Sequence, residues 1–452
     1  MRTVLVLGAG FSYAISPKMP LTDELGNLIR GRVAEVSTRM PRAFTGGYFE
    51  AWLSRLAEPQ PDLTPAQNAT NYGLFLQIAA ELHRLLQERE LAVLSDKPPW
   101  WLQRLVGLLH ATRTTAITFN YDTLVERTAP YLMLSDWKEH GFAKPFNVVQ
   151  EIPPSLHRSG WIVDRGAATF RLLKLHGSLD SYWVQNDSSG ATISRRDDLG
   201  TWGTAKAVDE QQRRRQLPGR EPYIVPPAAA KSAFYTNPIA RELWRSAAEA
   251  LQAADRIALV GYSIPPTDLV TSGMLADALA AGAKTVEVVN PYPEEIVARL
   301  VTLGQPKGQI HLVTGDEAIK RYTDQLELEQ GRRLVDLLKV ADRASNLLVA
   351  TSPHRAARVT SVAVNRQVVE LHITEIGNTS STTAMDPNGD APIVPVMALQ
   401  AALNADRIAQ VRYVSGEVAT IVGVAEHRES TGLGNGHWTV LVPSAMPPQR
   451  RP

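Results

Sequence analysis

The sequence predicts an α/β protein with a doubly wound parallel sheet and a helical insertion, followed by a small β-rich C-terminal domain. Three observations carry this prediction. Short apolar runs alternate with amphipathic stretches, as in strand–helix–strand units. A long segment in the first third has the three-to-four spacing of helices. Beyond about residue 345, alternating apolar and polar positions replace that helical spacing.

The N-terminal third supplies one strand and most of the helices. Residues 3–7 form an all-apolar run that enters a glycine turn, which is typical of a strand covered on both faces. A helix is expected to begin near Thr22, with the threonine hydroxyl as its cap. Residues 48–112 read as mostly helical, so a helical insertion is expected over about 40–112.

The remaining elements follow in strand–helix order. A short helix is expected from Asp122 onward, and an irregular segment without cysteine spans about 181–235. Within that segment we expect a hairpin and an arginine triplet, residues 213–215, on a solvated helix face. The predicted strands are 115–119, 171–175, 256–260, 284–289 and 309–313, and the predicted later helices are 238–254, 267–281 and 293–303.

Two domains are predicted. Residues 1–340 form the α/β domain, which ends in a long helix near 316–343. Residues 345–452 form the β-rich domain, with strand-like alternation in 358–376 and in later segments, the last of them "HWTVLV". Because this second domain shows no chemical constellation, its expected role is regulation or partner binding.

Composition restricts the function. The 452 residues carry a formal net charge of +1, which gives no electrostatic case for nucleic-acid or membrane binding. The apolar run at Val4–Leu7 is too short for a signal peptide, and no stretch approaches the roughly 20 apolar residues of a membrane span. A cytoplasmic protein is expected. The absence of cysteine excludes disulfides, thiol catalysis and cysteine-ligated zinc.

Polar residues and glycines follow every predicted strand of the α/β domain. In Rossmann-like sheets, ligands bind outside the carboxyl ends of the strands. One such end is ordinary turn chemistry, whereas six on one edge indicate a polar ligand of nucleotide size. The candidates are, strand by strand, Gly8, Ala9, Gly10 and Ser12; Asn120 and Asp122; His176; Gly261 and Ser263; Asn290; and Asp316.

The first glycine turn does not complete the usual dinucleotide fingerprint. Tyr13 stands where a third glycine is expected, and no strand ending in an acidic residue follows about 20 residues later. An ordinary Rossmann dehydrogenase is therefore disfavoured. His176 taken alone is also compatible with a capped histidine in a strand-to-loop turn.

The combination of motifs is more specific than any one of them. Over roughly residues 1–320 the chain resembles the sirtuin family, and within it the sirtuin-like domains of bacterial immune NADases. The motifs that carry the resemblance, in order, are "GAGFS" (8–12), "TFNYD" (118–122), "KLHGS" (174–178), "VGYS" (260–263) and "VVN" (288–290).

This resemblance implies a site for NAD⁺, used as a substrate. It makes His176 the catalytic histidine and Gly261–Ser263 a cofactor loop. Nicotinamide would lie near Asn120 and Asp122, and adenosine near Asn290.

The chemistry of these side chains suits cleavage of the nicotinamide–ribose bond. The amide of Asn120 can hold a ribose hydroxyl or the attacking water, and His176 has the intrinsic pKa to accept a proton. Asp122 can orient the carboxamide of nicotinamide or cap its own helix. The two glycine turns would offer backbone N–H groups to the pyrophosphate.

Differences between this sequence and the deacetylating sirtuins reduce the number of reactions that the resemblance implies. Deacetylating sirtuins carry a four-cysteine zinc ribbon after the catalytic histidine, whereas residues 181–235 contain no cysteine. Phe119 and Tyr121 also replace the usual glutamine and isoleucine. Both departures count against acyl-lysine chemistry and leave NAD⁺ cleavage unaffected.

The expected function is NAD⁺ glycohydrolase, in an antiphage-defence effector that depletes cellular NAD⁺ and needs no zinc. An NAD-dependent protein deacylase or ADP-ribosyltransferase is the first alternative, and a catalytically silent nucleotide-binding module the second. Because an unrestrained NADase would harm its host, we expect control by a homo-oligomer or an activating partner protein of a defence system. No nucleic acid or membrane is expected as a partner.

Overall fold

The computed structural model describes most of the α/β region and the strands of the C-terminal region. The described residues are 2–112, 114–131, 135–136, 144–145, 170–184, 193–196, 199–228, 235, 237–326, 329, 348–352, 355–364, 368–378, 393–394, 408–412 and 418–421.

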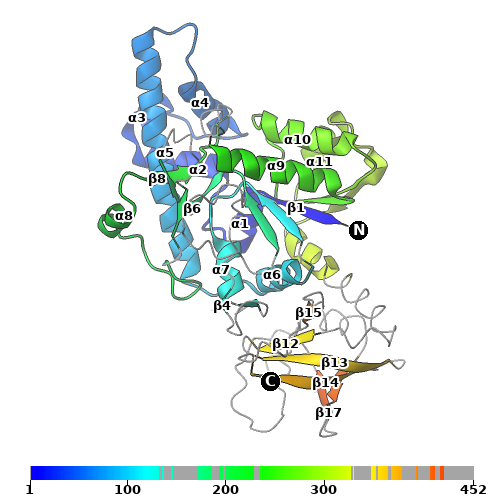
Figure 1. Ribbon diagram of the computed structural model, residues 1–452. Coiled ribbons are helices and arrows are strands. Elements are labelled where there is room, and N and C mark those ends of the chain that lie inside the picture. The colour runs from blue at the N-terminus through cyan, green and yellow to red at the C-terminus, as the bar shows by residue number, and fades with distance from the viewer. Residues whose placement is uncertain are drawn as a thin grey trace, which may run out of the picture.

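A six-stranded, fully parallel sheet forms the centre of the α/β region (Figure 1). Numbered along the chain, its strands lie in the order 3-2-1-4-5-6, which is the strand order of the Rossmann fold. The predicted fold class is thereby confirmed. Across the sheet the strands are β5 (Arg171–Lys174), β2 (Thr115–Thr118), β1 (Thr3–Leu7), β9 (Arg256–Val260), β10 (Thr285–Val289) and β11 (Ile310–Val313).

Helices cover both faces of the sheet, which explains why its strands are mostly apolar. Leu5 and Leu7 of β1 join a core with the helices of the N-terminal third. Val4 and Val6 point to the other face, toward three later helices. Those three are α9 (Pro238–Ala253), α10 (Leu269–Ala280) and α11 (Glu294–Thr302), the last followed by a 3-10 turn, Lys307–Gln309.

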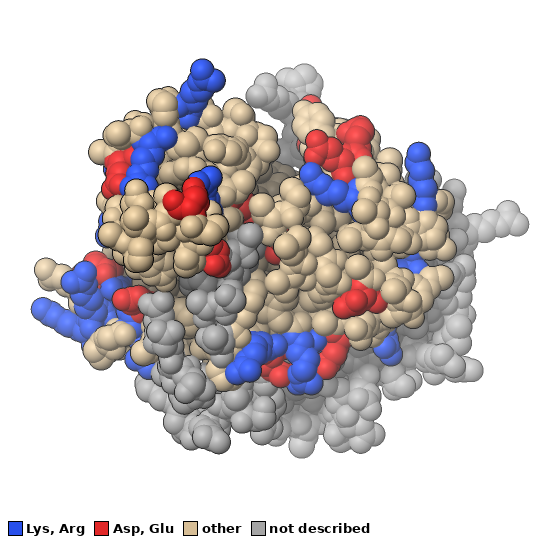
Figure 2. All heavy atoms as spheres, turned by 90° about the horizontal axis from the view of Figure 1, so that it is seen from above, with Lys and Arg blue, Asp and Glu red and all other residues tan. Residues whose placement is uncertain are grey.

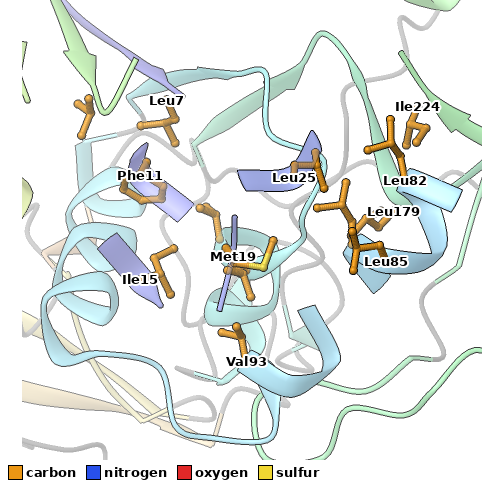
Figure 3. Packing of buried hydrophobic residues seen from close by; sticks show 14 of the residues in the cluster. Leu7, Phe11, Ile15, Met19, Leu25, Leu82, Leu85, Val93, Leu179 and Ile224 are labelled. Atoms are coloured by element: carbon orange, nitrogen blue, oxygen red, sulfur yellow. The ribbon is translucent and has the colours of Figure 1, made fainter. Parts of the chain in front are cut away.

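The predicted helical insertion is present and supplies much of the first core. Its longest helix, α5 (Pro65–Leu94), begins with a capping box between Thr64 and Gln67. Figure 3 shows side chains of the first two helical segments, such as Ile15 and Leu25, gathered with those of α5. The helices of this half are α1 (Ala9–Ile15), α2 (Thr22–Arg32), α3 (Ala34–Arg39), α4 (Tyr48–Ala57), α5, α6 (Trp100–Thr112) and α7 (Leu124–Tyr131).

The expected cap of α2 is wrong. The helix begins at Thr22, but the capping position is Leu21, and no side chain caps this end. Thr22 is one residue too far along the chain, because a capping side chain must precede the first helical residue. Asp23 instead accepts hydrogen bonds from the backbone N–H groups of Gly47 (2.7 Å) and Phe49 (3.3 Å), and so fastens the start of α4 to α2.

The predicted hairpin after His176 is present as the antiparallel pair of β6 (Gly177–Trp183) and β7 (Ser194–Arg195), and β8 (Glu221–Ile224) extends it to a three-stranded sheet. Strand β6 lies between β7 and β8. The helix α8 (Glu210–Gln216) lies between β7 and β8 in the chain.

The predicted solvated arginine face is wrong for one of its three members. Arg213 is buried, with its guanidinium 5.2 Å from the centre of the Tyr182 ring and bonded to Glu210. Its planar cation can stack on an aromatic ring in a buried setting, whereas Arg214 and Arg215 stay exposed as expected.

The described part of the C-terminal region is a second six-stranded sheet, so the predicted β-rich character is confirmed. Residues 318–326 are helical, and the rest of the predicted helix near 316–343 lies outside the described residues, as does "HWTVLV". The strand order is β15 (Ile393–Val394), β12 (Leu348–Ser352), β13 (Arg355–Val364), β14 (Val368–Asn378), β16 (Ile408–Arg412) and β17 (Val418–Ile421). A further pair, β3 (Ser135–Asp136) and β4 (Lys144–Pro145), is antiparallel.

The surface carries both signs of charge. Basic and acidic side chains are interspersed over the face shown in Figure 2, in keeping with the net charge of +1. Within the described residues, none of the helices has the length and apolar character needed to cross a membrane.

Gly261, directly after β9, allows the first test of this fold. Its φ is +62°, and a Cβ there would lie 2.3 Å from the backbone nitrogen of Phe11. We expect Gly261→Ala to lower the free energy of unfolding by more than about 2 kcal/mol. The matched control is Gly273→Ala inside α10, where a Cβ meets no atom within 4 Å. That variant should gain about 0.5–1 kcal/mol. Equal effects of the two substitutions in denaturant titrations would contradict the close packing at Gly261.

Candidate active site

The site is centred where β1 and β9 lie side by side at the middle of the sheet. The helices that follow these two strands pack on opposite faces, so the chain diverges at this point, and ligands of Rossmann-like sheets bind at such points. The turns after the two strands touch: the Gly10 N–H donates to the Gly261 carbonyl over 2.9 Å. A Cβ on Gly8 would lie 2.6 Å from that same carbonyl oxygen. Glycine is therefore required here for the approach of two backbones.

The same contacts engage several N–H groups that were expected to face a pyrophosphate. Gly8 N–H donates to Val260, and Phe11 N–H donates back to Gly8. Gly261 N–H donates to Val289. The glycines at positions 8, 10 and 261 thus allow the two turns to pack together, and their backbone N–H groups are hydrogen-bonded to carbonyls of the protein.

A chain of hydrogen bonds links the ends of β1 and β2. The Asn120 amide nitrogen donates to the Gly8 carbonyl and to the Ser12 hydroxyl, both at 2.8 Å. The Ser12 hydroxyl in turn donates to the Asp122 carboxylate at 2.5 Å. Ser12 and Asp122 are buried and Asn120 is half-buried. Three predicted site residues, one from α1 and two from the loop after β2, therefore form one connected polar group.

Asp122 also accepts a hydrogen bond from the start of the helix that follows it. Its second carboxylate oxygen accepts from the Leu124 N–H at 3.3 Å, at the start of α7, while the first holds Ser12. Asp122 lies one residue before the capping position, Thr123, and its carboxylate binds the first N–H of α7 from there. Contact with a nicotinamide carboxamide belongs to the proposal below.

Lys174 of β5 holds the loop that carries Asn120 and Asp122 through hydrogen bonds. Its ammonium group donates to the backbone carbonyls of Tyr121 and Asp122 and to the Glu126 carboxylate. Both side chains of the Lys174–Glu126 pair are buried, 2.8 Å apart. A buried charge is stable only when it is paired and hydrogen-bonded, and here the pairing fixes two carbonyls beside Asn120. A lysine within the apolar run "RLLKL" was the available signal.

His176 follows β5, and its ring lies in an aromatic group. The ring centre is 5.0 Å from that of Phe119 and 6.2 Å from that of Trp244. Phe119 stacks on Tyr262 at 4.8 Å. The histidine is buried, and it lies against the residue that immediately precedes Asn120.

Tyr121 connects the loops of Asn120 and His176. Its hydroxyl donates to the Val225 carbonyl at 2.6 Å, and the Val225 N–H donates to the His176 carbonyl at 2.8 Å. The Leu179 N–H donates to the Tyr121 carbonyl at 2.8 Å. Burial raises the pKa of Tyr121 above its usual range, so the phenol stays protonated as this donor.

The outer candidate residues lie at neighbouring strand ends and are not part of this polar chain. Ser263 and Asp316 are exposed. The Asn290 side-chain oxygen accepts from the Tyr292 N–H at 3.0 Å, and the backbone N–H of Asn290 donates to the Val313 carbonyl. Ala9 is the first residue of α1.

Glu90 of the helical insertion contacts the loop that carries Asn120 and Asp122, and no sequence pattern predicted this contact. One of its carboxylate oxygens accepts from the N–H and the hydroxyl of Thr123, at 2.5 and 2.8 Å. Burial raises the pKa of Glu90 to about 7, against the opposing charge of Arg127. The insertion is thereby hydrogen-bonded to the residue after Asp122.

Among the described residues, no three His, Cys, Asp or Glu side chains are grouped so as to hold a metal ion. The cysteine-free segment after His176 forms the sheet of β6, β7 and β8. Its interior is aromatic, with Trp183 and Tyr223 ring centres 4.8 Å apart.

Comparisons with known proteins give only distant structural matches. No family model and no curated protein matches the chain. A Sir2 mutant with a p53 peptide and NAD is 12% identical, covers 73% of this chain and 94% of its own, and has a TM-score of 0.31. A Sir2 homologue mutant with ADP-ribose is 14% identical, with coverages of 74% and 94% and a TM-score of 0.35. These TM-scores are too low for the likeness to decide what this chain does.

Replacing Glu90 by glutamine is expected to make stability less dependent on pH. The pKa of Glu90 is raised from 4.5 to about 7 in the folded protein, so the fold binds a proton that the unfolded chain has released. Stability should therefore fall as the pH rises through this interval. Between about pH 5.5 and pH 8, we expect the wild type to lose roughly 2 kcal/mol more than the variant.

Glu88→Gln on the same helix is the matched control, because Glu88 is exposed and bonded to Arg32, which lowers its pKa. Its difference from the wild type should stay constant over this range. If Glu90→Gln behaves in the same way in denaturant titrations, the burial of a titrating Glu90 is refuted.

Proposed function

We propose that the protein is an NAD⁺ glycohydrolase, which cleaves NAD⁺ with water into nicotinamide and ADP-ribose. The observation that carries the proposal is the hydrogen-bonded group of Asn120, Ser12 and Asp122 at the divergence of β1 and β9. His176 follows β5, which lies two strands from β1 on the side away from β9, and its ring contacts Phe119, the neighbour of Asn120. The motif resemblance to sirtuins supports the choice of NAD⁺.

An extended dinucleotide suits this edge of the sheet. We place its pyrophosphate across the turns Gly8–Ser12 and Gly261–Ser263, where two backbones already meet. The adenosine half would extend over the ends of β10 and β11, toward Asn290 and Asp316. The nicotinamide ribose would lie on the other side, toward Asn120.

The reaction needs little acid catalysis and much positioning. The C1′–N bond breaks with its electron pair passing to the pyridinium nitrogen, so nicotinamide leaves neutral. The ribose acquires oxocarbenium character, as in glycoside hydrolysis, and a water oxygen bonds to C1′. Holding that water in line is the main contribution the protein can make.

Asn120 and His176 have complementary roles in this step. The Asn120 amide nitrogen donates to Gly8 and Ser12, which fixes the amide plane and turns its carbonyl oxygen to a water or ribose hydroxyl. His176 accepts the proton that the water or hydroxyl releases. Asp122 holds Ser12 and lies where the nicotinamide carboxamide would bind.

We further propose that the C-terminal β-rich region controls this activity, through oligomers or through an activating partner of an antiphage system. The support is its separate six-stranded sheet and the harm that continuous NAD⁺ loss would cause a host. Moving from about 1% to 99% active takes roughly 5.5 kcal/mol of differential binding, which one protein interface can supply.

The direct assay is NAD⁺ turnover by the purified full-length protein over a wide range of protein concentration, with nicotinamide and ADP-ribose quantified. Glycohydrolase activity gives both products in equal amounts without an acceptor. Nicotinamide release that requires an acyl-lysine peptide would establish a deacylase, and transfer of ADP-ribose to protein a transferase. Binding of NAD⁺ without turnover under all activating conditions would establish a silent module.

Asn120→Ala and His176→Ala should each reduce NAD⁺ cleavage by roughly 10²–10⁴-fold, because they remove the water-positioning amide and the base. Asn120 is half-buried, so its truncation should change the free energy of unfolding by no more than about 1–2 kcal/mol, whereas loss of the buried His176 ring should cost up to about 3 kcal/mol. Asn71→Ala on α5 and His311→Ala at the exposed position of β11 are the matched controls. Wild-type turnover in either site variant, at an unchanged melting temperature, would overturn the mechanism.

Prolonged chelation should leave both turnover and melting temperature unchanged. The chain has no cysteine, and the module after His176 is packed around aromatic side chains. Dialysis against a strong chelator, followed by assay with and without added zinc, measures this. Loss of activity that zinc restores would reveal a histidine–carboxylate metal site.

A further inference from the structure

The backbone of Ile264 is the strained point of the proposed cofactor loop. Ile264 is the only non-glycine residue in the described part of the chain with a positive φ, at +50°. It is β-branched, buried to 2% exposure and followed by Pro265. A β-branched side chain is rarely found in this conformation, and such strain persists only where the surroundings hold it.

Arg299 of α11 holds the backbone of Ile264 in this conformation through hydrogen bonds. One guanidinium nitrogen donates to two successive backbone carbonyls, Ser263 at 2.7 Å and Ile264 at 2.9 Å. The other terminal nitrogen donates to Glu295 at 2.9 Å, one turn earlier on the same helix. Hydrogen bonds from a charged donor are stronger than neutral ones.

The loop is therefore fixed at both ends. At its start, Gly261 is packed against Gly10 with a φ of +62°. At its end, Arg299 holds Ser263 and Ile264. Between them, Tyr262 stacks on Phe119, which itself contacts His176. Because Tyr262 is anchored by this stacking, a shift of the Ser263–Ile264 peptide would move the exposed Ser263 side chain and leave the aromatic support of His176 in place.

We propose that Arg299 is a positioning residue, which holds the Gly261–Ile264 turn in the conformation that binds NAD⁺. This inference rests on the proposed function for its ligand. Arg299 acts through the two carbonyls and does not touch the reacting atoms. Its loss should therefore weaken NAD⁺ binding more than it slows the chemical step.

The test compares Arg299→Gln, Arg299→Lys and a matched control, Arg245→Gln. Arg245 also pairs with glutamates three and four residues away, on the exposed face of α9, but holds no loop. We expect Arg299→Gln to raise the KM for NAD⁺ about tenfold or more, with kcat within about twofold. Arg299→Lys should restore part of the loss, because an ammonium can donate to either carbonyl.

Hydrogen exchange of the ligand-free protein tests the hold without reference to NAD⁺. Arg299→Gln should speed exchange in residues 262–268 about tenfold or more, with that of α9 and β1 unchanged. Unchanged KM and unchanged exchange would overturn the proposal, as would faster exchange throughout the molecule with a lowered melting temperature. If the wild type neither binds nor cleaves NAD⁺, the proposed function fails, and the exchange result alone decides whether Arg299 holds the turn.

Discussion

The contact between the turns after β1 and β9 is the constraint on which the rest of the site depends. Gly8 and Gly10 lie so close to Gly261 that a single added carbon would meet backbone atoms at under 3 Å. This approach places the Gly8 carbonyl where Asn120 bonds to it, and places Ser12 one turn into α1. The glycines of the motif therefore serve first to bring two loops together. A ligand would bind to a surface that this contact has already shaped.

The loop that carries Asn120 is held by three separate parts of the chain. β1 holds it through the Gly8 carbonyl, β5 through the buried ammonium of Lys174, and the helical insertion through Glu90. Such redundancy limits motion of the amide, which is what delivery of water to an oxocarbenium-like ribose requires. The buried pair of Lys174 and Glu126 gains its value from this positioning, because a buried ion pair adds little net stability by itself.

The sequence predicts local and periodic features well and contacts between distant residues poorly. Strand and helix positions follow from spacing, and the strand-end side chains follow from the rule that parallel strands share a carboxyl edge. Glu90 lies 33 residues from its partner Thr123, and no pattern in α5 distinguishes it from a surface glutamate. The burial of Arg213 is unpredictable for the same reason, because it depends on the Tyr182 ring of β6. The predicted capping residue Thr22 lies one position past the true capping position, which is within the usual uncertainty of helix ends.

The central claim is that NAD⁺ binds along the edge where β1 and β9 diverge, with its nicotinamide ribose at Asn120. A crystal structure of the protein with ADP-ribose, one of the two products proposed, tests this most directly. The account predicts the pyrophosphate against the turns at Gly8–Ser12 and Gly261–Ser263, and the distal ribose within about 3.5 Å of the Asn120 amide. ADP-ribose bound elsewhere on the molecule, with this edge of the sheet unoccupied at saturating ligand, would contradict it.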